Sequence, residues 1–330
     1  MNTPHHPDHS RRQFILQGLT AAGGALLGGH AFAEGTAPVA KLPASETLVT
    51  TLYKSMNEAQ RKDLCFAFED KLRNKVDNNW HITPKRIDQV LDKDQQAMVR
   101  EIFDKLHSEE YKKRVWEQFD ADNQGDGGFG SASIALFGEP GAGKFEFVLT
   151  GRHCTRRCDG DSVAGAAFGG PIFYGHAARS FNEDPGHEGN VYWYQAKRAN
   201  EVFKALDGKQ REKALLENIR TEQGQNTIRL TGKKSGLDGI PVSELSADQK
   251  DLVRMVLADL LLPFRKEDAA EAMRHIEKNG FDSLHMAFSK NHDLGSDGIW
   301  DNWQIEGPSM VWLFRGAPHV HCWAHIRESV

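Results

Sequence analysis

The spacing of apolar residues predicts helices in the first third of the chain. Apolar side chains recur three and four positions apart over residues 46–71, 87–106 and 111–119, with charged residues between them. This period places the apolar residues on one face of a helix. We therefore expect amphipathic helices here that pack against a sheet.

The middle of the chain changes to extended segments. Residues 133–137, 145–157 and 162–174 are rich in aromatic and branched side chains, and an Asp-Gly pair within residues 159–161 separates the last two. An Asp-Gly pair between extended runs is a strong hairpin signal. The pattern predicts a β-meander in which residues 145–157 form one strand.

A second group of helices follows the meander. Helical spacing or capping signals mark residues 191–206, 210–219, 246–262 and 266–278, and glycines mark a loop over residues 223–240 with a short strand at 227–230. An extended segment at 284–288 leads to the final strands. This order predicts an α+β fold, a mainly antiparallel sheet with helical layers before and after it, in a single domain over residues 46–330. No fixed-period repeat is visible in the sequence.

The last strands carry the most distinctive chemistry. Ser309–Gly316 and His319–Ile326 are predicted to form a hairpin around a Gly-Ala-Pro turn. Alternation along the second strand places His319, His321 and His325 on one face. Three imidazoles on one face are uncommon without a metal ion, a proton-transfer role or a hydrogen-bond network.

We expect a metal site built from these histidines and from His153 on the predicted strand 145–157. If that strand neighbours the last one, His153 faces the same side as His319 and His321. The predicted ligands are His153, His319, His321 and His325, with His176 and His81 as further candidates for a fourth position. Neutral nitrogens with an open position suit zinc or copper. Glu139 is a candidate base.

The same strand neighbourhood makes a prediction about the four cysteines, Cys65, Cys154, Cys158 and Cys322. Cys154 and Cys322 would then lie together on the face opposite to the histidines. An oxidising compartment permits disulfides. This geometry favours a bridge between Cys154 and Cys322, and it leaves other pairings open.

The beginning of the chain has the features of an export signal. A twin-arginine pattern in Ser10–Leu16 precedes a short glycine-rich apolar run and a small-x-small site at Ala31–Ala33. We expect a twin-arginine signal peptide over residues 1–33, a flexible tether over residues 34–45 and a periplasmic or secreted protein carried by the twin-arginine translocase. Since no stop-transfer pattern follows, we expect no permanent membrane insertion.

Charge and two incomplete motifs exclude several partners. The formal net charge of −5 becomes −6 when two arginines and one aspartate leave with the signal, and no basic block remains, which argues against nucleic acid. Asp120–Ser131 begins like a calcium loop but has Ser131 where a glutamate is needed. Gly138–Lys144 resembles a phosphate-binding loop, yet Phe145 replaces its Ser or Thr, which indicates a hairpin turn. We expect neither a nucleotide nor haem.

Several short motifs follow one another in the order typical of a known family. They are Asn79–Pro84, Gly138–Pro140, Leu149–His153, Gly170–Gly175, Ile305–Pro308 and His319–His321. In this order the chain resembles the domain of unknown function 3500 family. The family usually has Gly-His-His where this chain has Gly151-Arg152-His153, and its ending differs from Cys322–His325. The resemblance therefore implies a fold unit and a residue set that includes His153, His319 and His321, and it implies no reaction.

Two functions remain as hypotheses. The first is an exported metalloprotein with a three-histidine copper or zinc site. The second is a non-catalytic exported binding or scaffold protein, in which the histidines and four tryptophans form an aromatic surface for a glycan or peptide; these are Trp300, Trp303, Trp312 and Trp323. The sequence has no Gly-x-Ser-x-Gly elbow and no His-Glu-x-x-His motif, so it gives no support for classical hydrolase chemistry. Whether the protein is an enzyme stays open at this point.

Overall fold

The computed structural model describes residues 44–177, 182, 184, 186, 187, 189–293 and 297–329. The predicted signal peptide and nearly all of the predicted tether lie outside these residues. Within the described chain, none of the helices combines the length and the hydropathy that a bilayer-spanning segment needs.

An 11-stranded mixed sheet runs through the described residues in the order β1-β2-β3-β4-β5-β11-β10-β9-β8-β6, with β7 paired to β8. The strands are β1 (Cys65–Phe66), β2 (Ser133–Gly138), β3 (Phe145–Gly151), β4 (Cys154–Cys158), β5 (Ile172–His176), β6 (Leu215–Leu216), β7 (Ile240–Pro241), β8 (His285–Ser289), β9 (Asn302–Glu306), β10 (Met310–Arg315) and β11 (Val320–Ile326). Only the pairs β1·β2 and β6·β8 are parallel. The predicted α+β fold with a mainly antiparallel sheet is confirmed.

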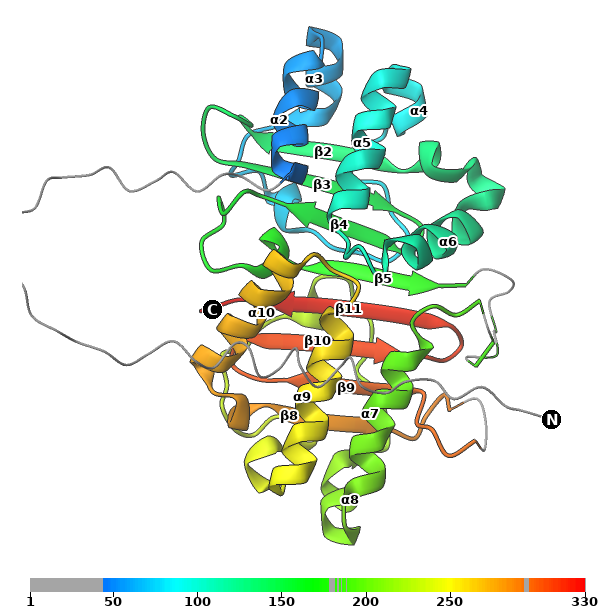
Figure 1. Cartoon of the computed structure of the whole chain (residues 1–330), viewed down its shortest axis with the longest axis vertical. Helices are drawn as coiled ribbons and strands as arrows, with labels where there is room; N and C mark the ends of the chain where they lie inside the picture. The colour runs from blue at the N-terminus through cyan, green and yellow to red at the C-terminus, as the bar shows by residue number, and fades with distance from the viewer. Residues whose placement is uncertain are drawn as a thin grey trace, which may run out of the picture. The chain divides into compact units, whose positions relative to one another are not determined.

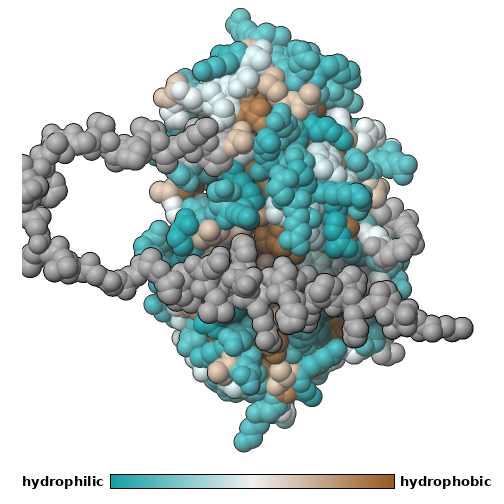
Figure 2. Space-filling model, in the orientation of Figure 1, coloured by the Kyte–Doolittle hydropathy of each residue, from teal (hydrophilic) through white to brown (hydrophobic). Residues whose placement is uncertain are grey.

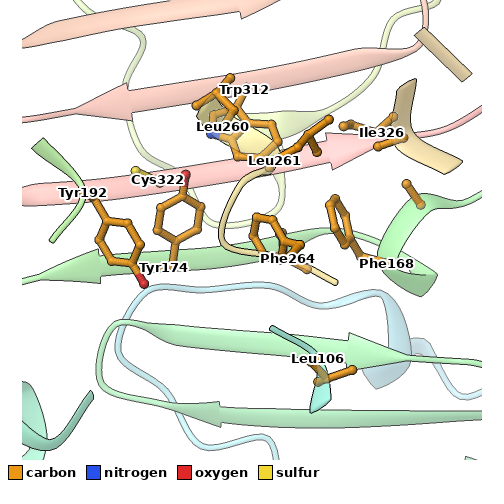
Figure 3. Close-up of a cluster of buried hydrophobic side chains, with 14 of the residues drawn as sticks. Leu106, Phe168, Tyr174, Tyr192, Leu260, Leu261, Phe264, Trp312, Cys322 and Ile326 are labelled. Atoms are coloured by element: carbon orange, nitrogen blue, oxygen red, sulfur yellow. The ribbon is translucent and has the colours of Figure 1, made fainter. Parts of the chain in front are cut away.

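The helices from both parts of the chain pack on one face of this sheet (Figure 1). They are α2 (Ala44–Ser55), α3 (Glu58–Leu64), α4 (Ile87–Val90), α5 (Lys93–Lys105), α6 (Lys112–Asn123), α7 (Trp193–Ala205), α8 (Gly208–Ala214), α9 (Ala247–Leu261) and α10 (Lys266–Asn279). Figure 3 shows part of the interface, where Leu260 and Leu261 of α9 meet Trp312 and Tyr174 of the sheet. The outer faces of these helices are largely hydrophilic (Figure 2), and Met255 is the one large apolar side chain exposed among the described residues.

Loops cover the opposite face of the sheet. Ile228 and Leu230 pack there against Phe173, Val311 and Trp323 in one buried cluster. A second cluster lies nearer the β1 edge, where the chain around Trp80 covers strands β2 and β3. Because long loops and not helices form this layer, polar residues can reach the strand ends on this face, and the candidate site lies here.

The described chain consists of two halves with the same topology. In each half a short helix ends at a two-residue strand that pairs in parallel with the first strand of a four-stranded antiparallel segment. The register is equivalent as well. Leu136 pairs with Cys65 and Phe147, whereas Phe288 pairs with Leu215 and Trp303. The structure therefore contains an internal repeat. It was not predicted from the sequence, although residues 91–100 and 245–254 share the pattern Leu-x-x-Asp-Gln-x-x-x-Val-Arg.

A pair of glutamines repeats in the two halves. Gln60 and Gln95 exchange side-chain hydrogen bonds of 2.7 and 3.1 Å, and Gln210 and Gln249 exchange bonds of 3.1 and 2.8 Å. Each glutamine also belongs to the capping box of its own helix. The pair thus joins two helix N-termini and satisfies amide groups that the fold removes from water.

Three predictions about the strands were wrong, and one strand was missed. Residues 145–157 form the hairpin β3–β4 and not one strand, because His153 has a φ of 50° and reverses the chain. Residues 227–230 lie partly in a 3-10 helix (Asn226–Ile228), and strand β9 was not predicted. Residues 162–171, expected to be extended, are turns and a short 3-10 helix before β5.

The predicted Cys154–Cys322 disulfide is also wrong. All four cysteines are free. Tyr174 of β5 pairs with Cys154 on one side and with Cys322 on the other. A strand therefore separates the two cysteines, and two strand spacings, about 9.5 Å, exceed the Cα separation that a disulfide allows.

Replacing Gln95 by alanine tests the glutamine pair. The change removes a capping-box partner and the two hydrogen bonds between Gln60 and Gln95, while Gln60 keeps its bonds to Val90 and Asn57. We therefore expect the free energy of unfolding to fall by about 1–3 kcal/mol. Lys93→Ala, an exposed position in the first turn of the same helix, is the control. Equal denaturant midpoints for the two variants would contradict this role.

Candidate metal centre

Three of the four predicted ligands meet at the loop-covered face. His153, His319 and His321 are buried, and each offers a nitrogen within 4.8 Å of the others. Nε2 of His319 lies 3.0 Å from Nε2 of His321. The ring of His153 lies with its centroid 5.2 Å from that of His319 and 5.1 Å from that of His321. Such a group of converging imidazoles could hold a metal ion.

The hairpin turn between β3 and β4 positions His153. Its φ of 50° is a conformation that few residues other than glycine adopt. The side-chain oxygen of Asn79 accepts a hydrogen bond of 3.0 Å from the backbone N–H of His153 and supports this turn. Gly175 makes room for the ring, since a Cβ atom there would lie 3.1 Å from Cδ2 of His153 and 2.3 Å from the carbonyl oxygen of Val320.

The predicted C-terminal hairpin positions the other two histidines and is confirmed. Strands β10 and β11 pair in antiparallel register around the turn, and Arg315 lies opposite His321. His319 directly precedes β11, and alternation places it on the same face as His321. A guanidinium nitrogen of Arg315 lies 3.5 Å from the carbonyl oxygen and from Nε2 of His319.

A buried carboxylate orients His153. Nδ1 of His153 lies 3.1 Å from Oδ2 of Asp122 on α6, and the same carboxylate accepts bonds from Gln118 and from the backbone of Ala177. Burial, the largest single influence, favours the neutral acid, but the hydrogen bond and charge of His153, the charge of His176 and the backbone N–H of Ala177 together outweigh it and lower the pKa of Asp122. The proton of the ring is therefore on Nδ1, and Nε2, which has no hydrogen-bond partner in the described structure, keeps its lone pair.

A second carboxylate orients His321. Glu222, in the loop after β6, accepts hydrogen bonds from Nδ1 of His321 at 3.0 Å, from the indole of Trp323 at 2.7 Å and from Arg315 at 2.9 Å. Burial alone would raise the pKa of Glu222, but these partners lower it to about 2. Burial also lowers the pKa of His321 to about 3, so the ring is neutral at pH 7 and donates from Nδ1. Its Nε2 is then free to act as a metal ligand.

A cavity of about 240 Å³ opens onto the three histidines. Its other lining residues are Asn78, Asn79, Arg152, Ala177 and Arg315. Arg152 and Asn79 are exposed to solvent. The histidine group is therefore buried within the protein and reachable from outside.

The other predicted site residues lie elsewhere. His325 is outside the histidine group, and its Nδ1 lies 3.2 Å from the carbonyl oxygen of Ile228. His81 lies 2.9 Å from the carbonyl oxygen of Ser131, and His176 lies 3.8 Å from Asp122. Glu139 is exposed in the β2–β3 hairpin turn, which matches the hairpin expected there.

The tryptophans do not form an exposed aromatic surface. Trp303, Trp312 and Trp323 are at most 1% exposed, and Trp300 is partly buried against the core. Cys322 lies in the helix-covered core and not beside the histidines. Sequence reasoning missed Asp122 and Glu222. Asp122 was noticed only as part of the incomplete calcium loop, and no spacing connects Glu222 to a histidine.

Replacing Glu222 by glutamine tests its role in holding the strand and its side chains. The isosteric amide places an N–H₂ group against three donors, so we expect the free energy of unfolding of the metal-free protein to fall by about 1.5–3 kcal/mol. Glu212→Gln, at an exposed position of α8, is the control. If both variants unfold at the denaturant concentration of the unaltered protein, Glu222 does not stabilise this region.

Comparison with known proteins identifies the family. No curated protein and no solved structure matches the chain significantly. The family model described as protein of unknown function (DUF3500) matches residues 40–328, nearly the whole described region. The motifs that carry the resemblance include two of the turns that build the histidine group. The chain belongs to the DUF3500 family.

Proposed function

We propose that this protein is an exported metalloprotein that binds a zinc or copper ion through His153, His319 and His321. The observation that carries the proposal is the orientation of the imidazoles. Asp122 and Glu222 each accept a hydrogen bond from Nδ1 of one histidine, and this leaves Nε2 of His153 and of His321 as ligand atoms in a group whose nitrogens lie within 4.8 Å of one another. Carboxylate partners of this kind accompany most histidine ligands of metal sites.

The composition of the site favours an ion with an open coordination position. Three protein nitrogens complete a structural site only with a fourth ligand, and no cysteine, fourth histidine or carboxylate joins the group among the described residues. In catalytic sites the fourth position is taken by water or substrate. The adjoining cavity gives a small molecule access to that position. A bound zinc ion would supply Lewis-acid chemistry there, and a copper ion would supply redox chemistry.

The proposed location rests on the N-terminal sequence. The twin-arginine pattern of Ser10–Leu16 supports export through the twin-arginine translocase to the periplasm or the medium. This route carries folded proteins, so a metal could be inserted before export.

Elemental analysis of the protein exported through its own signal tests the metal centre. We expect near-stoichiometric zinc or copper in the unaltered protein and its loss in the His319→Ala/His321→Ala double variant, because the variant removes two of three ligands. His325→Ala, on the same strand but outside the group, is the matched control and should retain the metal. Equal trace metal in all three proteins, also after reconstitution, would refute the proposal.

Asp122→Asn tests the orienting carboxylate. The amide keeps the size of the side chain but removes the charge that holds the Nδ1 proton of His153, so we expect metal affinity to fall by about 10–100-fold. Competition with a chromophoric chelator measures this affinity. Asp120→Asn, at an exposed position two residues earlier, should leave it unchanged. Unchanged affinity in both variants would exclude Asp122 as an orienting group.

A further inference from the structure

The polar groups of the cavity beside the histidines are almost all hydrogen-bond donors. Arg152 and Arg315 contribute guanidinium groups, and Asn78 and Asn79 contribute side-chain amides. The amide oxygen of Asn78 already accepts the backbone N–H of Asn79, and that of Asn79 accepts the backbone N–H of His153. Both amide nitrogens therefore remain as donors for a ligand.

The two carboxylates near the site are not available to a ligand. Asp122 and Glu222 do not line the cavity, and both are occupied by the donors described above. Glu222 balances the charge of Arg315, with which it forms an ion pair of 2.9 Å. Arg152 has no carboxylate partner within the described residues, and its one hydrogen bond there goes to the carbonyl oxygen of Ala177 at 3.1 Å.

From this arrangement we infer that the cavity binds a small molecule through a carboxylate or phosphate group, which Arg152 holds next to the metal ion. A guanidinium pairs with two oxygens of such a group at once. The volume of about 240 Å³ lies below the roughly 300–1,000 Å³ of pockets for larger ligands, so the ligand is a small oxyanion or the anionic end of a longer molecule. This inference rests on the proposed metal centre and adds to it the chemical class of the ligand.

Arg315 has a different role from Arg152. It is held by Glu222 and lies against His319, so it positions the metal ligands, and its replacement would disturb the site itself. Arg152 is on the hairpin turn directly before His153 and is exposed. Its side chain can therefore be changed without removing a contact to any of the three histidines.

Cobalt-substituted protein gives a direct test, because the visible bands of Co²⁺ report both metal binding and ligand entry. The unaltered protein, Arg152→Gln and Arg152→Lys are loaded with Co²⁺ and titrated with acetate, inorganic phosphate and neutral imidazole at constant ionic strength. We expect Arg152→Gln to weaken acetate and phosphate binding by about 10–100-fold and to leave imidazole binding unchanged. The anion affinity of Arg152→Lys should lie between those of the unaltered protein and Arg152→Gln, since lysine keeps the positive charge but cannot pair with two oxygens at once as a guanidinium does.

The control is Arg229→Gln, an exposed arginine that does not line the cavity, and it should behave as the unaltered protein. Cobalt bands that form in all proteins but respond to the anions with equal affinity in Arg152→Gln would overturn this inference and leave the metal centre intact. A preference for phosphate over acetate, or the reverse, lost together with Arg152 would support it and identify the anion. If no cobalt bands form in the unaltered protein, the metal centre and this inference both fail.

Discussion

The geometry of the candidate site depends on two carboxylates, the buried Asp122 and the half-buried Glu222, that accept hydrogen bonds from imidazole rings. A histidine ring can present either nitrogen, and without a fixed partner its tautomer and rotation vary. Asp122 and Glu222 remove this freedom for His153 and His321. Burying a carboxylate costs free energy unless strong donors surround it. Here each carboxylate accepts at least three hydrogen bonds. The same hydrogen bonds therefore stabilise the carboxylates and orient the imidazole rings.

The two carboxylates come from opposite sides of the sheet architecture. Asp122 is near the end of α6, in the helical layer, whereas Glu222 is in the loop layer that covers the other face. The site lies where the two layers approach each other around the ends of β5 and β11. Indole and guanidinium donors from the strands complete the shell around Glu222. The long loop after β6 therefore contributes a polar anchor besides its apolar contacts with Val311 and Phe173.

The sequence predicted the three histidines of the site but not the two carboxylates that orient them. The alternation of His319 and His321 and the turn before them are local features, and local periodicity is readable. His153 was correctly predicted to lie with His319 and His321, although it is in the turn between β3 and β4 and not within one long strand. Asp122 and Glu222 were out of reach because 31 residues separate Asp122 from His153 and 99 separate Glu222 from His321, and no periodic signal spans such loops. The repeat was also missed, although the pattern Leu-x-x-Asp-Gln-x-x-x-Val-Arg at residues 91–100 and 245–254 could have indicated it.

The repeat shows that the sheet alone does not create the histidine group. His153 is six residues beyond Phe147, and Ser309 is six residues beyond its counterpart Trp303, so both occupy the same position in the β3–β4 and β9–β10 turns. Both turns reverse the chain over two residues, and Gly307 bonds to Met310 as Gly151 pairs with Cys154. Yet Ser309 is fully buried and has no imidazole near it that could join a metal site among the described residues. The same backbone position thus holds a histidine of the candidate site in one half and a small packed residue in the other. At the β3–β4 turn the carboxylate of Asp122 on α6 holds the imidazole of His153, so the histidine group depends on elements outside the repeated sheet as well as on the turn itself.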